Sequence, residues 1–462
     1  MARSPHAYVR GNTVRYYEWL ATVKSGTLPE GPEIWICGDC HVGNLGPIAD
    51  AEGDIEFQIR DLDETVVGNP AHDLLRLSLS LASAARGSDL PGLTTAKMLE
   101  RIMEDYHRAF APNFDEKRDI TVPQSIRRVA KKAATASWKS FAREDLEGAA
   151  PTLPIGKCFW PLSQQEKHDI ERLVGEPEMH RLATALRSRG ANAEVKLVDS
   201  AYWVKGCSSL GRGRYAVLLE VEGKKSEHDY SLMDVKEAVK ASAPHNAHAK
   251  MPSDQAQRVV EGARHLSPYL GGRMSAVKLN GKSTFVRELM PQDRKVEIEE
   301  LTTEEAIEVA GFLAAVVGKA HGGQMDAAER KQWQRELQRG QSKSLEAPGW
   351  LWTGVVELLV DHERGYLDHC RRFALEERNV DAVAKGAQLL RERSSFLTVN
   401  EVKSEGLSNS ASASNFQSTT KRDYRPQWGP NERTLDGSRP RTFEIRQRRL
   451  LEITDCVSLR RV

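Results

Sequence analysis

Two acidic runs near the start of the chain contain the residue types that phosphoryl transfer needs. The first, Gly38-Asp39-Cys40-His41-Val42-Gly43-Asn44, places an aspartate and an asparagine five residues apart on one loop with two glycines. The second places Asp61 at the end of the next predicted strand. One carboxylate can orient and deprotonate an accepting hydroxyl, while an amide and a second carboxylate hold Mg²⁺ against nucleotide phosphates. The pattern therefore favours catalysis at Asp39 and metal binding at Asn44 and Asp61.

The second acidic run continues with Asp63 and Glu64, and Asp73 follows in the first turn of a predicted helix. A buried carboxylate needs cations beside it, so Asp63 and Glu64 either face solvent or belong to a charged site. We assign Asp63 as a further metal ligand. For Asp73 a role in complementing the helix dipole or bracing a loop is favoured over direct chemistry. A structural Asx turn is the alternative for the Asp39 loop.

The first run also spells Cys37-x-x-Cys40-His41, which is typical of haem c attachment and could begin a zinc site. Haem attachment requires export, and the N-terminus lacks the apolar core of a signal peptide. Neither metal interpretation explains Gly43 and Asn44, so phosphoryl transfer remains the favoured chemistry.

A second set of candidate residues lies in the middle of the chain. The segment Gly206–Gly213 is rich in Gly and Ser between two predicted strands, so its backbone N–H groups could cover phosphates, although a plain hairpin is the alternative. Lys236 ends the third strand, which is where a lysine that holds the α- and β-phosphates is found. Glu261, on the next predicted helix, either pairs with Lys236 or lies on a solvated face. The nucleotide-binding candidates are Gly206, Ser208, Ser209, Gly211, Lys236 and Glu261.

Composition excludes several classes of partner. The 462 residues include 66 Lys and Arg against 65 Asp and Glu, so the net charge of +1 gives no field that attracts nucleic acid or an anionic membrane. The six cysteines are scattered, which fits free thiols in a reducing cytosol. No apolar run approaches the length of a membrane span. We therefore expect a cytoplasmic protein with no membrane partner and no specific nucleic-acid partner.

The predicted elements position these candidates in an α+β fold. Short strands precede Asp39 and Asp61, and a buried leucine-rich helix follows Asn69-Pro70. Strands are expected at 195–198 and 201–204, and Asn280-Gly281 predicts a hairpin. The chain divides into a part with both acidic loops (1–115), a helical insert (116–194), a β-rich nucleotide-binding lobe (195–290), a helical part (291–399) and a disordered basic tail (400–462).

The acidic runs resemble the catalytic core of the aminoglycoside phosphotransferase and choline kinase group, within the protein-kinase-like superfamily. The loop of that group is His-Gly-Asp-x-His-x-Gly-Asn, and this chain has Cys37 in place of the first His. Gly68, Pro70 and Asp73 also follow Asp61 at matching spacings. The resemblance implies that Asp39 is the catalytic base and that Asn44 and Asp61 hold the metal.

In those families an ATP-holding lobe precedes the catalytic loop, whereas here only 38 residues precede Asp39 and the lobe at 195–290 follows it. This arrangement resembles an uncharacterised bacterial family, domain of unknown function 2252, over about residues 5–375. The matching segments include Tyr8-Val9-Arg10-Gly11, Val235-Lys236-Glu237-Ala238 and Ala320-His321. The resemblance implies a bilobal kinase-like fold with circularly permuted connectivity, in which the chain near His321 ends beside Ile34.

The expected function is ATP- and Mg²⁺-dependent phosphoryl transfer to a hydroxyl acceptor, a small molecule in the first instance. Two alternatives remain open at this stage. One is a nucleotide-binding module without catalysis, and the other is a protein kinase or AMP transferase on the same fold. The acceptor is not encoded in any motif of the sequence.

Overall fold

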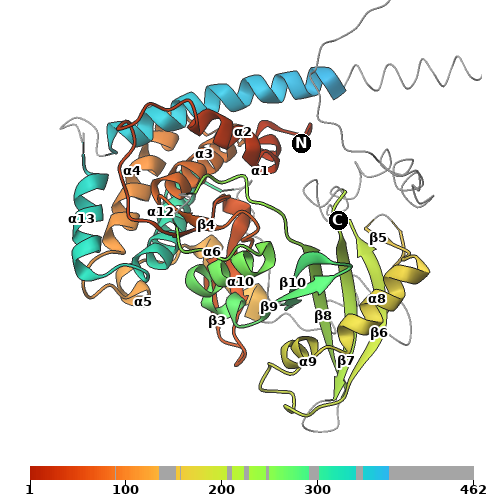
Figure 1. Ribbon diagram of the computed structural model, residues 1–462. Coiled ribbons are helices and arrows are strands. Elements are labelled where there is room, and N and C mark those ends of the chain that lie inside the picture. The colour runs from red at the N-terminus through yellow and green to blue at the C-terminus, as the bar shows by residue number, and fades with distance from the viewer. Residues whose placement is uncertain are drawn as a thin grey trace, which may run out of the picture. The chain divides into compact units, whose positions relative to one another are not determined.

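The structure, a computed structural model, has a mixed α+β fold (Figure 1). It describes residues 1–88, 90–134, 152–156, 158–204, 211–222, 228–245, 249–290, 301–339 and 347–373. Residues up to Asp368 belong to one compact unit. Within the described ranges, no helix is long and apolar enough to cross a membrane. The predicted tail at 400–462 lies outside the described residues.

Two short antiparallel ladders carry the acidic loops. The outer ladder pairs β1 (Ile34–Ile36) with β4 (Val66–Gly68), and the inner ladder pairs β2 (Leu45–Ala49) with β3 (Ile55–Ile59). The first loop joins β1 to β2 and the second joins β3 to β4. Because the four strands are nested in this way, both loops emerge where the two ladders meet.

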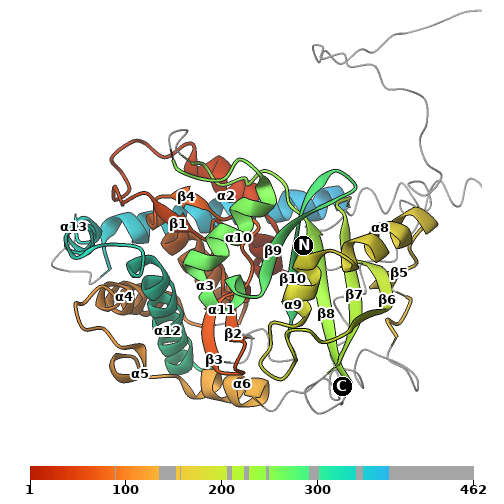
Figure 2. The same ribbon diagram turned by 60° about the horizontal axis from the view of Figure 1, so that its bottom comes forward.

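Helices surround this scaffold. The N-terminal pair is α1 (Pro5–Gly11) and α2 (Thr13–Leu20). The buried centre is formed by α3 (Ala71–Gly87), α4 (Gly92–Arg108) and α12 (Thr303–Gly322), and α12 lies beside α4 (Figure 2). The same helical part also contains α5 (Glu116–Asp119), α6 (Gln124–Ala134), α13 (Ala327–Leu337) and a helix over residues 349–373.

The core of this helical part contains the leucine-rich helix that the sequence predicts to be buried. The predicted leucine-rich helix is α3, in which Leu74, Leu75, Leu77, Leu79 and Leu81 are at most 1% exposed. These side chains join one large apolar cluster with the buried faces of α4 and α12. Burial of this extent is the main favourable contribution to folding.

A six-stranded antiparallel sheet has the strand order β5-β6-β7-β8-β10-β9. Its strands are β5 (Phe159–Trp160), β6 (Val195–Trp203), β7 (Arg214–Glu222), β8 (His228–Glu237), β9 (Met274–Leu279) and β10 (Lys282–Leu289). The helices α8 (Gln164–Val174) and α9 (Pro177–Ala183) cover one face of the sheet (Figure 1). The helices α10 (Gln255–Leu266) and α11 (Pro268–Gly271) connect β8 to β9.

Several local predictions are confirmed. The hairpin between β9 and β10 turns at Asn280 and Gly281, whose positive φ angles of 53° and 72° are the reason that this dipeptide favours such turns. Beyond the end of α12, Gln324 Nε2 donates to Trp35 O at 3.0 Å, and Trp35 N donates to Gln324 Oε1 at 2.9 Å. The end of α12 therefore lies beside β1, as expected.

Three predictions are corrected. The segment 116–194 is not only helical, because its β5 extends the sheet beside β6. The strands expected at 195–198 and 201–204 are one strand, β6, with an irregularity between Leu197 and Asp199. Cys158 is disulfide-bonded, so the expectation of free thiols holds for Cys37, Cys40 and Cys370 but not for it.

Candidate active site

The two acidic loops touch each other through their backbones. Gly38 has a φ of +76°, and a Cβ atom added there would lie 2.1 Å from the carbonyl oxygen of Glu64. Only glycine combines this backbone conformation with so close an approach. Thr65 Oγ1 donates to Ile36 O at 2.6 Å, which fixes the same junction from the other side. Asp39 and the second acidic run are therefore neighbours.

A buried carboxylate braces the first loop. Asp73, 1% exposed, accepts hydrogen bonds from Cys37 N at 2.7 Å and from Gly38 N at 3.0 Å. Its Oδ2 also lies 3.1 Å from His321 Nε2, and Tyr106 Oη lies 2.9 Å from His321 Nδ1. Asp73 thus has the bracing role that was favoured for it. Cys37 takes part in this brace through its backbone N–H, which does not depend on the type of side chain. A cysteine is therefore compatible with the brace at the position where the aminoglycoside phosphotransferase and choline kinase group has histidine.

The two oxygens of the Asp39 carboxylate have different surroundings: an arginine holds Oδ1, and Oδ2 remains available. Arg76, which is fully buried, donates from Nε to Asp39 Oδ1 at 2.9 Å, and its Nη2, which donates to Val9 O, lies 2.9 Å from the same oxygen in an ion pair. Asp39 Oδ2 lies 3.7 Å from His41 Nε2, which is beyond a hydrogen bond. Burial lowers the pKa of His41 to about 3, so this ring is neutral near pH 7. Asp39 is 17% exposed and keeps one oxygen available to a substrate hydroxyl.

The hairpin of β2 and β3 brings Asn44 beside Asp61. Arg60 N donates to Asn44 O at 2.7 Å, directly at the base of the ladder. The Asn44 side chain donates from Nδ2 to Asp39 O at 3.0 Å, which leaves its Oδ1 as a possible metal ligand. Burial alone would raise the pKa of Asp61, but the charges of Lys236, Arg287 and Arg214 hold it well below its ordinary value.

This donor set suits Mg²⁺. An ionised carboxylate and an amide oxygen are hard ligands, and Mg²⁺ is usually held by one or two such groups together with substrate phosphates and water. Among the described residues, no group of three or more His, Cys, Asp and Glu side chains converges as a metal site, so the zinc interpretation of Cys37 and Cys40 gains no support there.

One face of the sheet presents charged groups towards the acidic loops. Arg214 is opposite Lys236 in the register of β7 and β8, and Arg287 is opposite Asp234 in that of β10 and β8. Residues directly opposite in a ladder share a face, as do residues two apart on one strand. Asp234 accepts from Arg214 Nη2 at 2.6 Å and from Arg287 Nη2 at 3.0 Å. Arg287 Nη1 also donates to Arg60 O at 2.7 Å, which joins the sheet to the second loop.

Lys236 is 2% exposed, and its ammonium group forms an ion pair with Asp63. The side chain of Asp63 was predicted to bind metal, and in this structure its Oδ2 is engaged with the lysine instead. Glu261 does not pair with Lys236. It lies 3.1 Å from Arg264 and 3.4 Å from His265 on its own helix and is 37% exposed, which agrees with the solvated-face alternative.

The glycine-rich loop is described only at its end. Gly211 lies shortly before β7 and has a φ of +78°, a backbone conformation that glycine adopts more readily than other residues. Gly206, Ser208 and Ser209 lie outside the described residues, and their predicted contact with phosphates stays a prediction.

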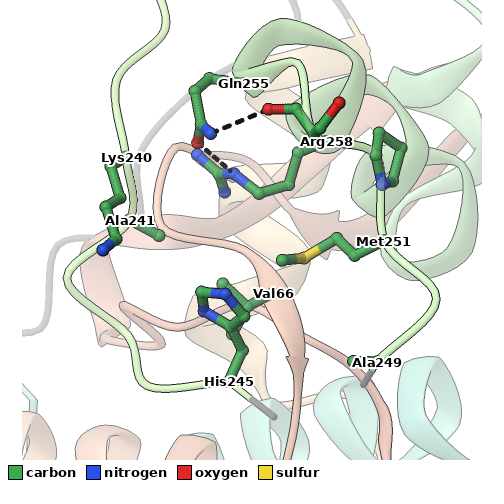
Figure 3. A pocket seen from close by; sticks show the side chains of 10 residues that line it. Val66, Lys240, Ala241, His245, Ala249, Met251, Gln255 and Arg258 are labelled. Atoms are coloured by element: carbon green, nitrogen blue, oxygen red, sulfur yellow. Dashed lines mark hydrogen bonds between the residues drawn. The ribbon is translucent and has the colours of Figure 1, made fainter. Parts of the chain in front are cut away.

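Arg258 of α10 ties the second acidic loop in place and was not predicted. Its guanidinium donates to Asp63 O at 2.9 Å, to Val239 O at 3.0 Å and to Thr65 O. It also lines a cavity of about 210 Å³ together with Val66 of β4 and the segment that enters α10 (Figure 3). Arg76 was missed as well, although it lies one helical turn after Asp73 on α3 and so faces the same loop.

Comparison with known protein families agrees with one sequence prediction. A family described as "Uncharacterized protein conserved in bacteria (DUF2252)" matches residues 1–372. The chain belongs to this family. The matched range contains both acidic loops, the six-stranded sheet and α12, and it nearly coincides with the span of 5–375 inferred from the motifs. No curated protein and no solved structure matches the chain.

Proposed function

We propose that this DUF2252 protein is an ATP- and Mg²⁺-dependent phosphotransferase that acts on a hydroxyl acceptor, on a circularly permuted kinase-like fold. Asn44 and Asp61 would hold Mg²⁺, which neutralises charge on the phosphates when bound. Lys236 would contact the α- and β-phosphates, and the 206–213 loop would cover them. Asp39 would accept the hydrogen bond of the acceptor hydroxyl.

The order of elements supports the kinase-like part of the proposal. The described residues of 195–290 contain five strands, with α10 and the four-residue helix α11 after the third, in the order β6, β7, β8, α10, α11, β9 and β10. A five-stranded lobe with its helix is what the resemblance requires, and Lys236 lies on the third strand, where the phosphate-binding lysine is expected. The contact between Gln324 and Trp35 supports the permutation, because a chain joined at that point would run from α12 into β1.

A single observation carries the proposal: Lys236 of the sheet meets the loop of Asp61, which is itself next to Asn44 and Asp39. Residues separated by about 170 positions in sequence thus supply a lysine, two carboxylates and an amide to one place. Phosphoryl transfer depends on positioning such groups, since little covalent chemistry is required of the protein.

The environment of Asp39 narrows its role. Arg76 fixes one oxygen of the Asp39 carboxylate in place and leaves the other for the substrate, so the main contribution of Asp39 would be to orient the hydroxyl. The substitution Asp39→Asn keeps an oxygen for Arg76 but removes the charge. It should lower turnover by a factor of about 10² to 10⁴ and leave ATP affinity within about threefold of the wild type.

The test uses the full chain with ATP, Mg²⁺ and a metabolite library in a thermal-shift screen, because a ligand of the native state raises its melting temperature. Ligands that shift the transition are then assayed for transfer by mass spectrometry. A gain of about 80 Da on the ligand supports phosphotransfer, whereas about 329 Da on a protein would indicate AMP transfer. Loss of ATP binding equal to the loss of turnover in Asp39→Asn would contradict the role given to Asp39.

A further inference from the structure

We infer that Asp63 is the positioning residue for Lys236, and that α10 acts on this lysine through Arg258 and the backbone of the second acidic loop. The inference rests on the proposed function, since Lys236 is taken to bind nucleotide phosphates. It differs from the arrangement in which a carboxylate of the helix itself holds the lysine.

The first step of the argument is the contact of Lys236. The ammonium is almost fully buried and therefore needs a counter-charge. Asp63, 22% exposed, is in direct contact with it, whereas Glu261 of α10 is engaged with Arg264 and His265. The second acidic loop, and not the helix, therefore supplies the partner of the lysine.

The second step is how α10 holds that loop. Arg258 is 1% exposed and donates to the carbonyl oxygens of Asp63 and Thr65. One turn further along α10, a Cβ atom at Gly262 would lie 2.4 Å from Thr65 Cγ2, so the helix and the loop pack without space between them. A displacement of α10 would move Asp63, and with it the lysine.

The third step concerns what Lys236 would do without Asp63. Arg214 and Arg287 are cations on the same sheet face, and both are paired with Asp234. Among the described residues, Asp61 is a further carboxylate whose charge acts on the lysine, and the proposed function assigns Asp61 to Mg²⁺. Loss of Asp63 would thus turn Lys236 towards Asp61, away from the phosphates, and would occupy the metal ligand as well.

The experiment compares ATP with adenosine as ligands of the full chain in the presence of Mg²⁺, by titration calorimetry. Adenosine lacks the groups that Lys236 would contact, so the ratio of the two affinities reports the phosphate contact and not the general integrity of the site. Asp63→Asn should weaken ATP binding about tenfold, the size expected for one charge-assisted hydrogen bond, and leave adenosine unchanged. Asp63→Glu should restore most of the ATP affinity.

Two further variants separate α10 from the loop. Arg258→Gln should also weaken ATP binding, and the double variant with Asp63→Asn should be no weaker than Asp63→Asn alone, because both changes remove the same positioning. Asp54→Asn is the matched control, since it removes an exposed carboxylate from the opposite end of the β2–β3 hairpin and should change neither affinity.

The outcomes are distinct. If Asp63→Asn binds ATP as well as or more tightly than the wild type, or if Glu261→Gln reproduces the loss while Asp63→Asn does not, the inference is wrong and the phosphotransfer proposal stands. If the wild-type chain has no preference for ATP over adenosine, the proposed function fails and this inference fails with it.

Discussion

The buried carboxylate of Asp73 offers a quantitative test of how the first acidic loop is held. The substitution Asp73→Asn keeps the shape of the side chain but replaces one acceptor oxygen with an NH₂ donor. In the native structure both oxygens are used, by Cys37 N, Gly38 N and His321 Nε2. An asparagine can accept from only one of the two backbone groups, and its own donor then faces the other.

The expected cost follows from these contacts. One buried backbone N–H is left without an acceptor, which costs about 1–3 kcal/mol. The remaining bonds change from charge-assisted to neutral, which costs about 1 kcal/mol more. We therefore expect Asp73→Asn to lower the free energy of unfolding by about 2–4 kcal/mol.

Urea denaturation followed by tryptophan fluorescence measures this change, and it should appear as a lower midpoint with an unchanged slope. Asp54→Asn, an exposed carboxylate on the same scaffold, is the control and should stay within about 0.5 kcal/mol of the wild type. A loss for Asp73→Asn as small as that of the control would refute the conclusion that Asp73 braces the loop.

Three further predictions concern the same site and its surroundings. Gly38→Ala should destabilise the protein by about 3 kcal/mol or more, because its φ is +76° and a Cβ would collide with the Glu64 carbonyl; an unchanged urea midpoint would contradict the close contact of the loops. Asp61→Asn should remove the gain in ATP affinity that Mg²⁺ gives, measured by calorimetry with and without EDTA, and a gain equal to that of the wild type would exclude Asp61 as a ligand. Burial lowers the pKa of four histidines from 6.5 to about 3 or 4, so the unfolded chain binds more protons between these values and stability should fall as the pH falls from about 6.5 towards 4; urea midpoints that do not change over this range would show that these rings are not buried as neutral groups. These histidines are His6, His41, His72 and His362.

The acidic loops could be predicted because their signals are local. The glycines, the Asp39–Asn44 spacing and the strand before Asp61 all lie in or directly beside the β2–β3 hairpin, so the sequence pattern already indicates that the carboxylates converge. The Asn280-Gly281 turn could also be predicted, since this dipeptide prefers the φ angles that the turn requires. Similarly, the nearly continuous leucines of α3 required burial on most faces.

In contrast, the sequence did not predict which charged side chains pair with one another. Lys236 and Asp63 are 173 positions apart, and no periodicity relates them. On α10, the sequence suggested Glu261 as a partner of Lys236, with a solvated face as the alternative, and in the structure Glu261 contacts Arg264 and His265. Arg258 binds backbone carbonyl oxygens, and because every residue has one, the sequence does not indicate which of them an arginine will contact.

The most direct test of the central claim replaces Mg²⁺ with Fe²⁺ in the presence of ATP and ascorbate, so that radicals formed at the metal cut the nearby backbone. Mass spectrometry of the fragments then locates the metal. The account predicts ATP-dependent cuts near Asn44 and Asp61 and on β8 near Lys236, all lost on adding excess Mg²⁺. Cuts elsewhere in the chain, or cuts in the acidic loops without any near Lys236, would contradict a shared site for metal and nucleotide.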